Sequence, residues 1–253
     1  MRGSGQRARF ETCFNFRDLG GHEGLGGRRV RREVVYRSDS LHRASDADLE
    51  LLRTFSVRTV LDLRTTGELT RWGRFPLAHE LAWRHLPLFE EEAIPFDLAR
   101  VEDPEPPAVI ARGWGYVAIA AAGGPPVAGA LRAIAEGEHA VVFHCSAGKD
   151  RTGIVAALLL SLLGVDDEAI VADYERSDGS VEAWLSWAKE RAPEEADRFV
   201  ASTPSWVMRA PAPIMRGFLE GMRQTYGSIE AYLAGIGVDE AMVETLRDRL
   251  LEQ

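Results

Sequence analysis

The sequence predicts an α/β fold with a central, mostly parallel sheet flanked by helices, followed by a helical C-terminal part. Strand-like and helix-like segments alternate through the first two thirds of the 253 residues, a pattern typical of a sheet covered by helices on both faces. A short β-rich run at 139–143 leads through a polar loop into an apolar helix, which is the strand–loop–helix unit of such folds. The last third shows helical patterns only.

The first half of the chain supplies the outer parts of this sheet. Residues 11–40 contain short strand-like pieces broken by two Gly-Gly pairs, with the best strand at 34–36. Ser45 is expected to begin a helix, with Asp48 completing an approximate capping box. A buried strand follows at 57–63, and residues 80–88 predict another.

The middle of the chain leads to the decisive segment. The stretch 90–107 is acidic and holds four prolines, so it is expected to be a surface loop or lid. Helices are expected at 109–122 and 127–135, separated by Gly-Gly-Pro-Pro at 123–126. After the strand at 139–143 come a loop at 144–151, a helix from Thr152, and further helices within 166–201 and 211–252.

The length fits one domain, residues 1–253, in which 1–10 are a loose N-terminal segment. Residues 166–253 would form either a helical elaboration or a lid. The N-terminus lacks the apolar core of a signal peptide, and Met1 to Gly5 are either a cloning remnant or a loose end. The longest apolar run, 154–163, is far shorter than the ~20 residues of a membrane span. We therefore expect no stable membrane insertion and a cytoplasmic location, with export without a signal peptide left open.

Charge and cysteine content limit the function. The net charge of −9 argues against a nucleic-acid or membrane-surface binder, because such binding needs a basic face. Two cysteines form no disulfide framework and no zinc-type spacing, which favours a reducing compartment and predicts no metal and no cofactor. Only two of the 30 basic residues are lysines, Lys149 and Lys189, so Lys149 in the polar loop is unusual for this chain.

The polar loop has the character of an anion site. Residues 144–153 read His-Cys-Ser-Ala-Gly-Lys-Asp-Arg-Thr-Gly. A loop between a strand and a helix N-terminus gathers backbone N–H groups and the positive end of the helix dipole. Gly148 lets the backbone approach a ligand, and the Arg151 fork matches phosphate oxygens. Phosphate or another oxyanion is the expected ligand, held by Ser146, Ala147, Gly148, Lys149 and Arg151.

Cys145 begins this loop, where amides, dipole and cations favour the thiolate. A thiolate beneath a bound phosphoryl group is an in-line nucleophile, and its attack gives a cysteinyl-phosphate that water hydrolyses. The loop amides and Arg151, with Lys149 as a further candidate, would stabilise the charge without a metal. Cys13 lacks such a loop and is expected to pack in the core.

Cys145 and Arg151 form the C-x5-R signature of protein tyrosine phosphatases. The whole string resembles the atypical bacterial and fungal members of dual- or triple-specificity type. Other stretches with counterparts in these proteins are 15–21, 36–38, and 61–64 followed by Glu68. The resemblance therefore extends over residues 15 to about 155, at ordered positions.

The resemblance implies roles for individual residues. Cys145 would be the nucleophile, and Arg151 would bind the phosphate in substrate and transition state. His144 would orient or acidify the thiol, and Thr152 would donate a hydrogen bond to the thiolate. Asp150 is the preferred general acid. Asp62 is the alternative, and an internal lysine such as Lys149 resembles phosphoinositide phosphatases.

Several of these residues also have structural interpretations. Lys149 and Asp150 could form a local ion pair, and an acid is in any case favourable at a helix N-terminus. Asp62 and Arg64 could simply end a buried strand at solvent. Arg17 and Asp18 are expected to brace each other beneath the loop.

The predicted function is metal-independent hydrolysis of phosphomonoesters, first phosphotyrosine, with phosphoserine/threonine proteins or phosphoinositides as further substrates. One alternative is an inactive phospho-ligand-binding module, which would be expected to lack the cysteine or the arginine. Another is a sulfur-transfer or arsenate-reducing enzyme. Such an enzyme usually lacks this loop frame or needs partner thiols, and Cys13 is the only other cysteine.

Overall fold

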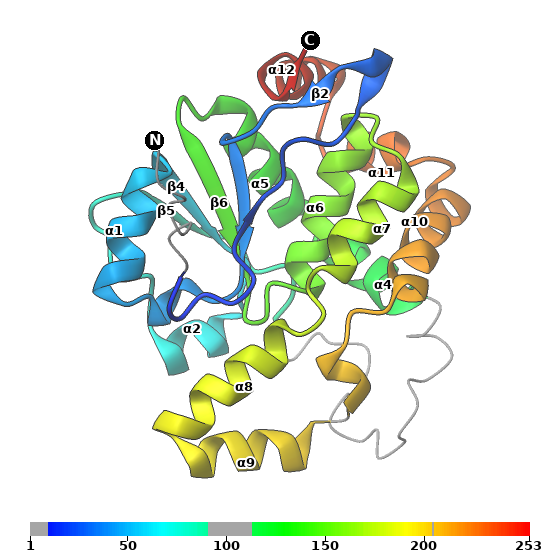
Figure 1. The fold of residues 1–253 in the computed structure, drawn as a ribbon. Coiled ribbons are helices and arrows are strands. Elements are labelled where there is room, and N and C mark those ends of the chain that lie inside the picture. Colours follow the sequence, from blue (N-terminus) through cyan, green and yellow to red (C-terminus); the bar gives the residue numbers. More distant parts are fainter. Residues whose placement is uncertain (1–9, 91–112, 204) are drawn as a thin grey trace, which may run out of the picture.

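The computed structural model describes residues 10–90, 113–203 and 205–253 (Figure 1). The predicted loop or lid at 90–107 and the predicted loose N-terminus lie outside these residues, apart from Glu90 and Phe10. The start of the helix predicted at 109 lies outside them as well.

A five-stranded sheet forms the centre of the molecule and confirms the predicted α/β class. Its strands, in spatial order, are β1 (Arg17–Asp18), β3 (Val35–Ser38), β6 (Ala140–His144), β4 (Val57–Asp62) and β5 (Ala82–His85). Only β1 is antiparallel to its neighbour. Ser38, His144 and Asp62 lie side by side in register, so three parallel strands end together at one edge of the sheet.

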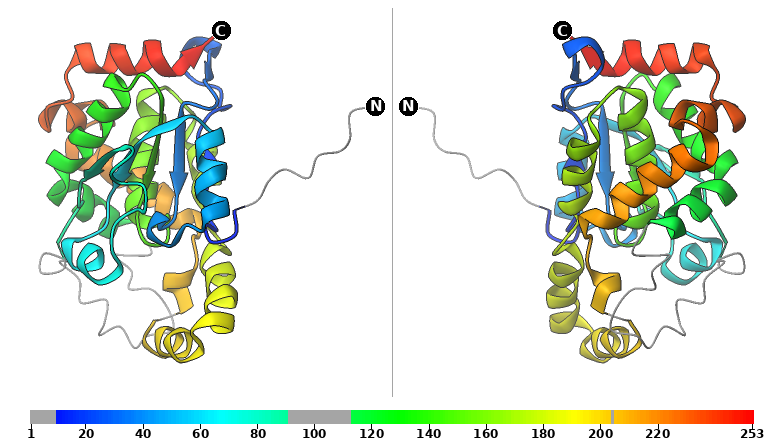
Figure 2. Two further views of the ribbon diagram at one scale, coloured as in Figure 1. Left: turned by 90° about the vertical axis from the view of Figure 1, so that its left-hand side faces the viewer. Right: turned by 90° about the vertical axis from the view of Figure 1, so that its right-hand side faces the viewer.

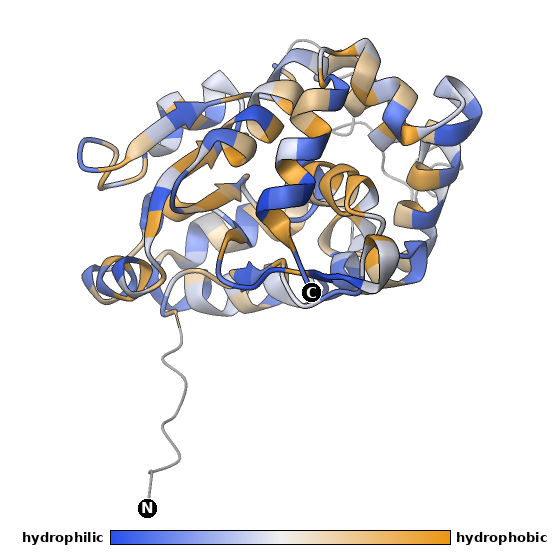
Figure 3. Cartoon of the chain, turned by 90° about the horizontal axis from the view of Figure 1, so that it is seen from above, coloured by the Kyte–Doolittle hydropathy of each residue, from blue (hydrophilic) through white to orange (hydrophobic). Residues whose placement is uncertain are grey.

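Alternating side chains of the central strand build a core on each face of the sheet. Val141 and Phe143 of β6 face the larger core, whereas Ala140 and Val142 face the smaller one. Helix α1 (Asp46–Thr54) covers the smaller core, and α5 (Gly124–Glu136) and α6 (Asp150–Leu162) lie on the other side of the sheet (Figure 1). Several outer helices carry both hydrophobic and hydrophilic residues (Figure 3), as expected of elements buried on one side.

Helix α6 is apolar all round because it is enclosed by other helices. Every residue from Arg151 to Leu160 is buried, which identifies it as a central helix. It begins at Asp150 rather than at the predicted Thr152, so Asp150 and Arg151 belong to its first turn. Because His144 belongs to β6 as well, the loop covers residues 145–149 and is three residues shorter than predicted.

Local sequence signals explain most of the other helix boundaries. The predicted capping box of Ser45 and Asp48 is present at the start of α1. A second capping box, formed by Thr65 and Glu68, begins α2 (Thr66–Trp72), a helix that we did not predict. The remaining short elements are the 3-10 turns η1 (Leu25–Gly27) and η2 (Leu41–Arg43).

Helix α4 (Trp114–Ala122) is separated from α5 by Gly123 alone. The predicted four-residue break is wrong, because Pro125 and Pro126 occupy the first turn of α5, where the missing N–H costs no hydrogen bond. No single described helix has the length and apolarity of a membrane span. Together α4 and α5 reach it, but the chain bends by 78° between them.

The C-terminal third divides into two parts. The helices that pack on the core are α7 (Asp167–Glu175), α10 (Ala212–Tyr226), α11 (Ile229–Gly235) and α12 (Glu240–Leu250). The others, α8 (Ser180–Arg191), α9 (Pro193–Ser202) and η5 (Ser205–Met208), extend beyond the edge where the parallel strands end (Figures 1 and 2). The prediction of helices only is wrong at the end, because β7 (Leu251–Glu252) pairs with β2 (Arg29–Val30).

Candidate active site

The anion loop, residues 145–149, connects the central strand β6 to the central helix α6. It turns at Gly148, whose φ is +68°. A Cβ atom at this position would lie 2.6 Å from the backbone nitrogen of Asp39 and from the carbonyl oxygen of Ser38. Only glycine combines this conformation with such a close approach. The close approach is to the backbone of the neighbouring strand end, whereas the predicted approach to a ligand stays a prediction.

Three carbonyl groups of the loop are held from outside it. The carbonyl of Ser146 accepts a hydrogen bond from Ser40 N (3.1 Å), that of Ala147 from Asn15 Nδ2 (2.9 Å), and that of Gly148 from Arg37 Nη2 (2.8 Å). In a trans peptide the N–H points opposite to the C=O, so the N–H groups of residues 147–149 face away from these anchors. They donate to no described group and are free to bind an oxyanion.

A buried carboxylate supports these anchors. Asp173 of α7 accepts hydrogen bonds from Arg17 Nε (2.8 Å) and Arg37 Nη1 (2.5 Å). Burial would raise the pKa of Asp173, but the two guanidinium groups hold it well below its usual range. Asp173 thus remains charged and fixes Arg37 against Gly148. Sequence reasoning missed Asp173, for which no local signal exists.

Arg17 and Asp18 do not brace each other, so this prediction is wrong. Arg17 points to Asp173 and also donates to Ser177 Oγ (3.1 Å). Asp18 accepts from the backbone nitrogens of Gly20 (2.7 Å) and Glu33 (2.9 Å). Successive residues of a strand point to opposite faces, which separates the two side chains.

Cys145 lies buried where β6 ends, at the start of the loop. Thr152 is also buried, and its hydroxyl has no hydrogen-bond partner in the described chain. The predicted bond from Thr152 to the sulfur is therefore not formed in this structure. Cys13 packs in the smaller core, and burial together with the charges of Asp39 and Asp48 raises the pKa of its thiol well above the usual value. Cys13 is a poor nucleophile, as predicted.

His144 contacts the backbone rather than the thiol. Its Nδ1 lies 3.3 Å from the carbonyl oxygen of Cys145. Burial lowers the pKa of His144, so the ring is neutral at physiological pH. Of the two predicted actions of His144 on the thiol, acidification by a positive charge does not fit a neutral ring, and orientation of the thiol stays a prediction.

Arg151 is held by a carboxylate that sequence reasoning had not placed in the site. Its Nη1 and Nη2 donate to the two oxygens of Glu68, at 2.9 Å for Nη2, and Ser146 Oγ donates to the same carboxylate. Burial would raise the pKa of Glu68, but Arg151 and Ser146 lower it to about 2. This end-on pairing leaves Nε of Arg151 without a partner among the described groups. In the sequence, Glu68 stands out only as one of the residues that carry the family resemblance.

Burial would lower the pKa of Arg151, but the hydrogen bond to Glu68 and the nearby charge of Cys145 raise it above its usual value. The guanidinium also lies 5.2 Å from the centre of the Phe89 ring. Arg151 therefore stays positively charged and interacts electrostatically with Cys145.

Asp150, the first residue of α6, has 40% of its side chain exposed. Its Oδ1 accepts a hydrogen bond from the Tyr116 hydroxyl. The Lys149 ammonium lies 3.4 Å from the same oxygen. No described group donates to Oδ2. A carboxyl group at the mouth of the loop with one free oxygen has the geometry required of a proton donor.

Lys149 is directed toward the η5 segment rather than into the loop, which is not the placement that its predicted role in substrate binding requires. Its Nζ donates to the carbonyls of Val207 (2.6 Å) and Arg209 (3.0 Å). The buried ammonium thus fastens the anion loop to the η5 segment. Lys149 also forms a local ion pair with Asp150, which was the alternative interpretation from the sequence.

Asp62 and Arg64 form a fully buried pair at the end of β4 and do not reach solvent, so their predicted place at a solvent-exposed strand end is wrong. Arg64 Nε and Nη2 donate to Asp62 at 2.9 and 2.6 Å. Burial opposes the charge of Asp62, but the facing ring of His144 and the Arg64 guanidinium lower its pKa to about 2. Asp62 has no proton to donate at neutral pH, which argues against it as general acid.

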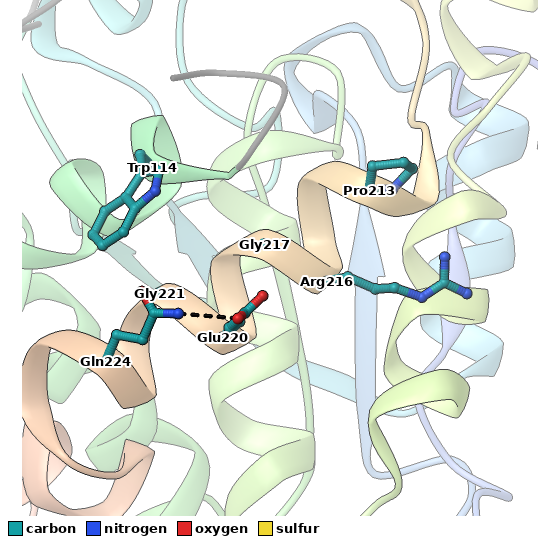
Figure 4. Close-up of a pocket in the computed structure, with 7 residues that line it drawn as sticks. All are labelled: Trp114, Pro213, Arg216, Gly217, Glu220, Gly221 and Gln224. Atoms are coloured by element: carbon teal, nitrogen blue, oxygen red, sulfur yellow. Dashed lines mark hydrogen bonds between the residues drawn. The ribbon is translucent and has the colours of Figure 1, made fainter. Parts of the chain in front are cut away.

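A separate hollow lies between α4 and α10 (Figure 4). It has a volume of about 550 Å³ and is lined by seven residues: Trp114, Pro213, Arg216, Gly217, Glu220, Gly221 and Gln224. None of them belongs to the anion loop. Within the described ranges, no group of three His, Cys, Asp or Glu side chains is arranged to hold a metal ion.

The fold and the loop define a class of protein. A buried cysteine that begins a loop of unoccupied amides, with an arginine in the following helical turn, at the carboxyl edge of a parallel sheet, is the arrangement of cysteine-dependent phosphatases, which use a covalent cysteinyl-phosphate. A model of the tyrosine phosphatase family matches residues 8–252, and the chain belongs to this family.

Three relatives agree with this assignment. A provisionally named tyrosine-protein phosphatase of Cupriavidus necator is 33% identical over 88% of this chain and 81% of its own. A tyrosine-protein phosphatase of Nostoc commune is 32% identical over 87% and 75%. The triple specificity protein phosphatase PtpB of Mycobacterium tuberculosis is 30% identical over 94% and 97%.

Solved structures with a more distant likeness include the core catalytic domain of a PP-IP phosphatase of S. cerevisiae. It is 16% identical, with a TM-score of 0.36, over 75% of this chain and 85% of that one. TpbA of P. aeruginosa is 18% identical, with a TM-score of 0.35, over 69% and 90%.

Proposed function

We propose that this protein-tyrosine phosphatase hydrolyses phosphomonoesters through a cysteinyl-phosphate on Cys145, with Arg151 as the phosphate clamp and Asp150 as the general acid. The observation that carries the proposal is the anion loop. Its carbonyls are fastened outward, its amides are unoccupied, and its arginine is held end-on by Glu68. Such a preorganised set of donors stabilises charge without reorganising during the reaction.

In the first step the phosphoryl dianion binds the loop amides and the free Nε edge of Arg151. The Cys145 sulfur forms a bond to phosphorus while the bond between phosphorus and the ester oxygen breaks. Asp150 gives its proton to that oxygen, so the product leaves as a neutral phenol or alcohol. Of the acids near the loop, Asp150 alone combines exposure with an oxygen that has no described donor.

In the second step water attacks the phosphorus, and Asp150, now ionised, accepts its proton. The S–P bond breaks, and inorganic phosphate leaves. The returning thiolate needs a hydrogen-bond donor. Thr152 is the candidate, because its buried hydroxyl has no partner among the described residues, whereas the Ser146 hydroxyl already donates to Glu68.

Phosphotyrosine is the first substrate to test. The Mycobacterium relative is named a triple specificity protein phosphatase, which supports testing further substrates, and we choose phosphoserine, phosphothreonine and phosphoinositides. The placement of Lys149 bears on this breadth. Because its ammonium is held by backbone carbonyls of the η5 segment, it is not positioned to bind a second phosphate group, which favours monophosphorylated substrates.

The test is hydrolysis of 4-nitrophenyl phosphate by the purified protein, with and without vanadate. Cys145→Ser is expected to lose activity while still binding vanadate, and Cys13→Ser serves as the matched control that keeps activity. Hydrolysis that persists in Cys145→Ser would overturn the covalent mechanism. Vanadate binding without hydrolysis by the unmodified protein would instead support the phospho-ligand-binding module.

A further inference from the structure

We propose that Tyr116 and Tyr174 are positioning residues for Asp150, which they hold in the orientation that delivers its proton. The inference rests on the proposed role of Asp150 as general acid and assigns two residues from helices outside the anion loop. Tyr116 comes from α4 and Tyr174 from α7, whereas Asp150 begins α6.

The three side chains form one hydrogen-bonded chain. The Tyr116 hydroxyl donates to Oδ1 of Asp150, and the hydroxyls of Tyr116 and Tyr174 are 2.8 Å apart. The two rings meet edge to face, with centroids 6.1 Å apart and planes at 80°. A carboxylate can only accept, so the single proton of Tyr116 goes to Asp150, and Tyr174 must donate to the oxygen of Tyr116.

The direction of this chain does not change at working pH. Both tyrosines are buried. Burial, together with the charge of Asp150, raises the pKa of each hydroxyl well above its ordinary value. Tyr116 therefore donates to Oδ1 whether Asp150 is ionised or carries its proton on Oδ2.

This arrangement distinguishes the two oxygens of Asp150. Oδ1 faces Tyr116 and Lys149, whereas no described residue donates to Oδ2. A partly exposed aspartate would otherwise rotate among several rotamers. Holding one oxygen leaves the other directed at the mouth of the loop, and such prior orientation lowers the barrier to proton transfer.

The backbone of α6 is shaped to admit this contact. Gly153 lies three residues after Asp150, and a Cβ atom there would be 3.1 Å from Cδ2 of Tyr174. The missing side chain lets the Tyr174 ring approach α6 closely. Simple packing would explain two buried tyrosines, but it would not require their hydroxyl chain to end on the exposed acid of the loop.

The test compares leaving groups, because only poor ones need a proton. Phenyl phosphate releases a basic phenolate and depends on the acid, whereas 2,4-dinitrophenyl phosphate releases a stable anion and does not. The variants are Tyr116→Phe, Tyr174→Phe and Asp150→Asn. Tyr232→Phe is the matched control, since its buried hydroxyl donates to the carbonyl of Ala120 in the same helix α4 and does not touch Asp150.

Asp150→Asn should lower kcat/KM for phenyl phosphate about 100-fold or more, with little loss for the dinitrophenyl ester. Tyr116→Phe should lose about tenfold on phenyl phosphate and less than about twofold on the other. Tyr174→Phe should change in the same direction by less. Tyr232→Phe should change neither, and vanadate inhibition should be the same in all tyrosine variants.

Two results would overturn the inference while leaving Asp150 as the acid. In the first, Tyr116→Phe leaves the kinetics unchanged. In the second, Tyr116→Phe lowers kcat/KM equally for both esters. Either result counts only if Asp150→Asn discriminates between the two esters in the same assay. Equal losses would identify a general structural role. If Asp150→Asn itself fails to discriminate, the general acid of the proposed function is wrong, and the role of the tyrosines fails with it.

Discussion

Replacing Asp173 by asparagine tests whether the buried charge cluster holds the anion loop in shape. Asp173 presents one oxygen to Arg17 and the other to Arg37. Asparagine keeps the shape but removes the charge and turns an NH2 donor toward one of the two guanidinium donors. Removing one partner from a buried ion pair costs about 3–5 kcal/mol, because the other charge is left buried and uncompensated.

For Asp173→Asn we expect a loss of at least about 3 kcal/mol in the free energy of unfolding, since two cations lose their counter-charge. For a chain of this size that corresponds to a fall in Tm of about 6–12 °C. The anion loop should suffer as well. Arg37 holds the carbonyl of Gly148, so a looser Arg37 predicts weaker vanadate inhibition.

The measurement is thermal and urea unfolding beside Asp167→Asn as control. Asp167 lies on the same helix and pairs with Arg223, but the two side chains are 41% and 45% exposed. An exposed pair contributes about 1 kcal/mol or less. If Asp173→Asn is no less stable than Asp167→Asn, the reasoning about the buried cluster is refuted. Unchanged vanadate inhibition in a destabilised variant would refute its link to the loop.

Three further predictions concern the loop and its surroundings. Glu68→Gln should lower kcat/KM and vanadate affinity about tenfold or more, because the charged hydrogen bonds that orient Arg151 are weakened; equal kinetics would contradict this. Gly148→Ala should cost more than about 1 kcal/mol in unfolding and weaken oxyanion binding, since its Cβ would collide with the backbone of Asp39. Asp62 and Glu68 have folded pKa values of about 2, below their ordinary 3.8 and 4.5. The stability they add is complete above about pH 5 and is lost as pH falls toward 2, so acid unfolding of Glu68→Gln should show a shallower pH dependence.

The parts predicted well from sequence are those determined by local physics. The strand at 139–143 and the glycine turn at Gly148 follow from residues that are neighbours in the chain. So does the capping box of Ser45 and Asp48. The missed helix α2 carried a similar signal, Thr65 followed three residues later by Glu68. The same rule applied there would have predicted it.

The parts predicted poorly depend on partners far away in sequence. Arg17 pairs with Asp173, 156 residues later. Lys149 reaches carbonyls near residue 208, about 60 residues away. Nothing in the local pattern selects such partners. The rarity of lysine draws attention to Lys149, but rarity carries no information on where the side chain points.

The pairing of both cations changes how the loop must attract phosphate. Because Arg151 is paired with Glu68 and Lys149 is held by two backbone carbonyls, neither side chain is free to turn toward an approaching substrate. The attraction then comes mainly from aligned amides and the α6 dipole, which act only over the first turn. Affinity for oxyanions should therefore depend steeply on loop geometry and weakly on salt. That geometry is determined from outside, by Asn15, Ser40 and Arg37 on the loop carbonyls. Substitutions at these three anchor residues are thus expected to impair phosphate binding, although the anchors bind the loop carbonyls and not the phosphate.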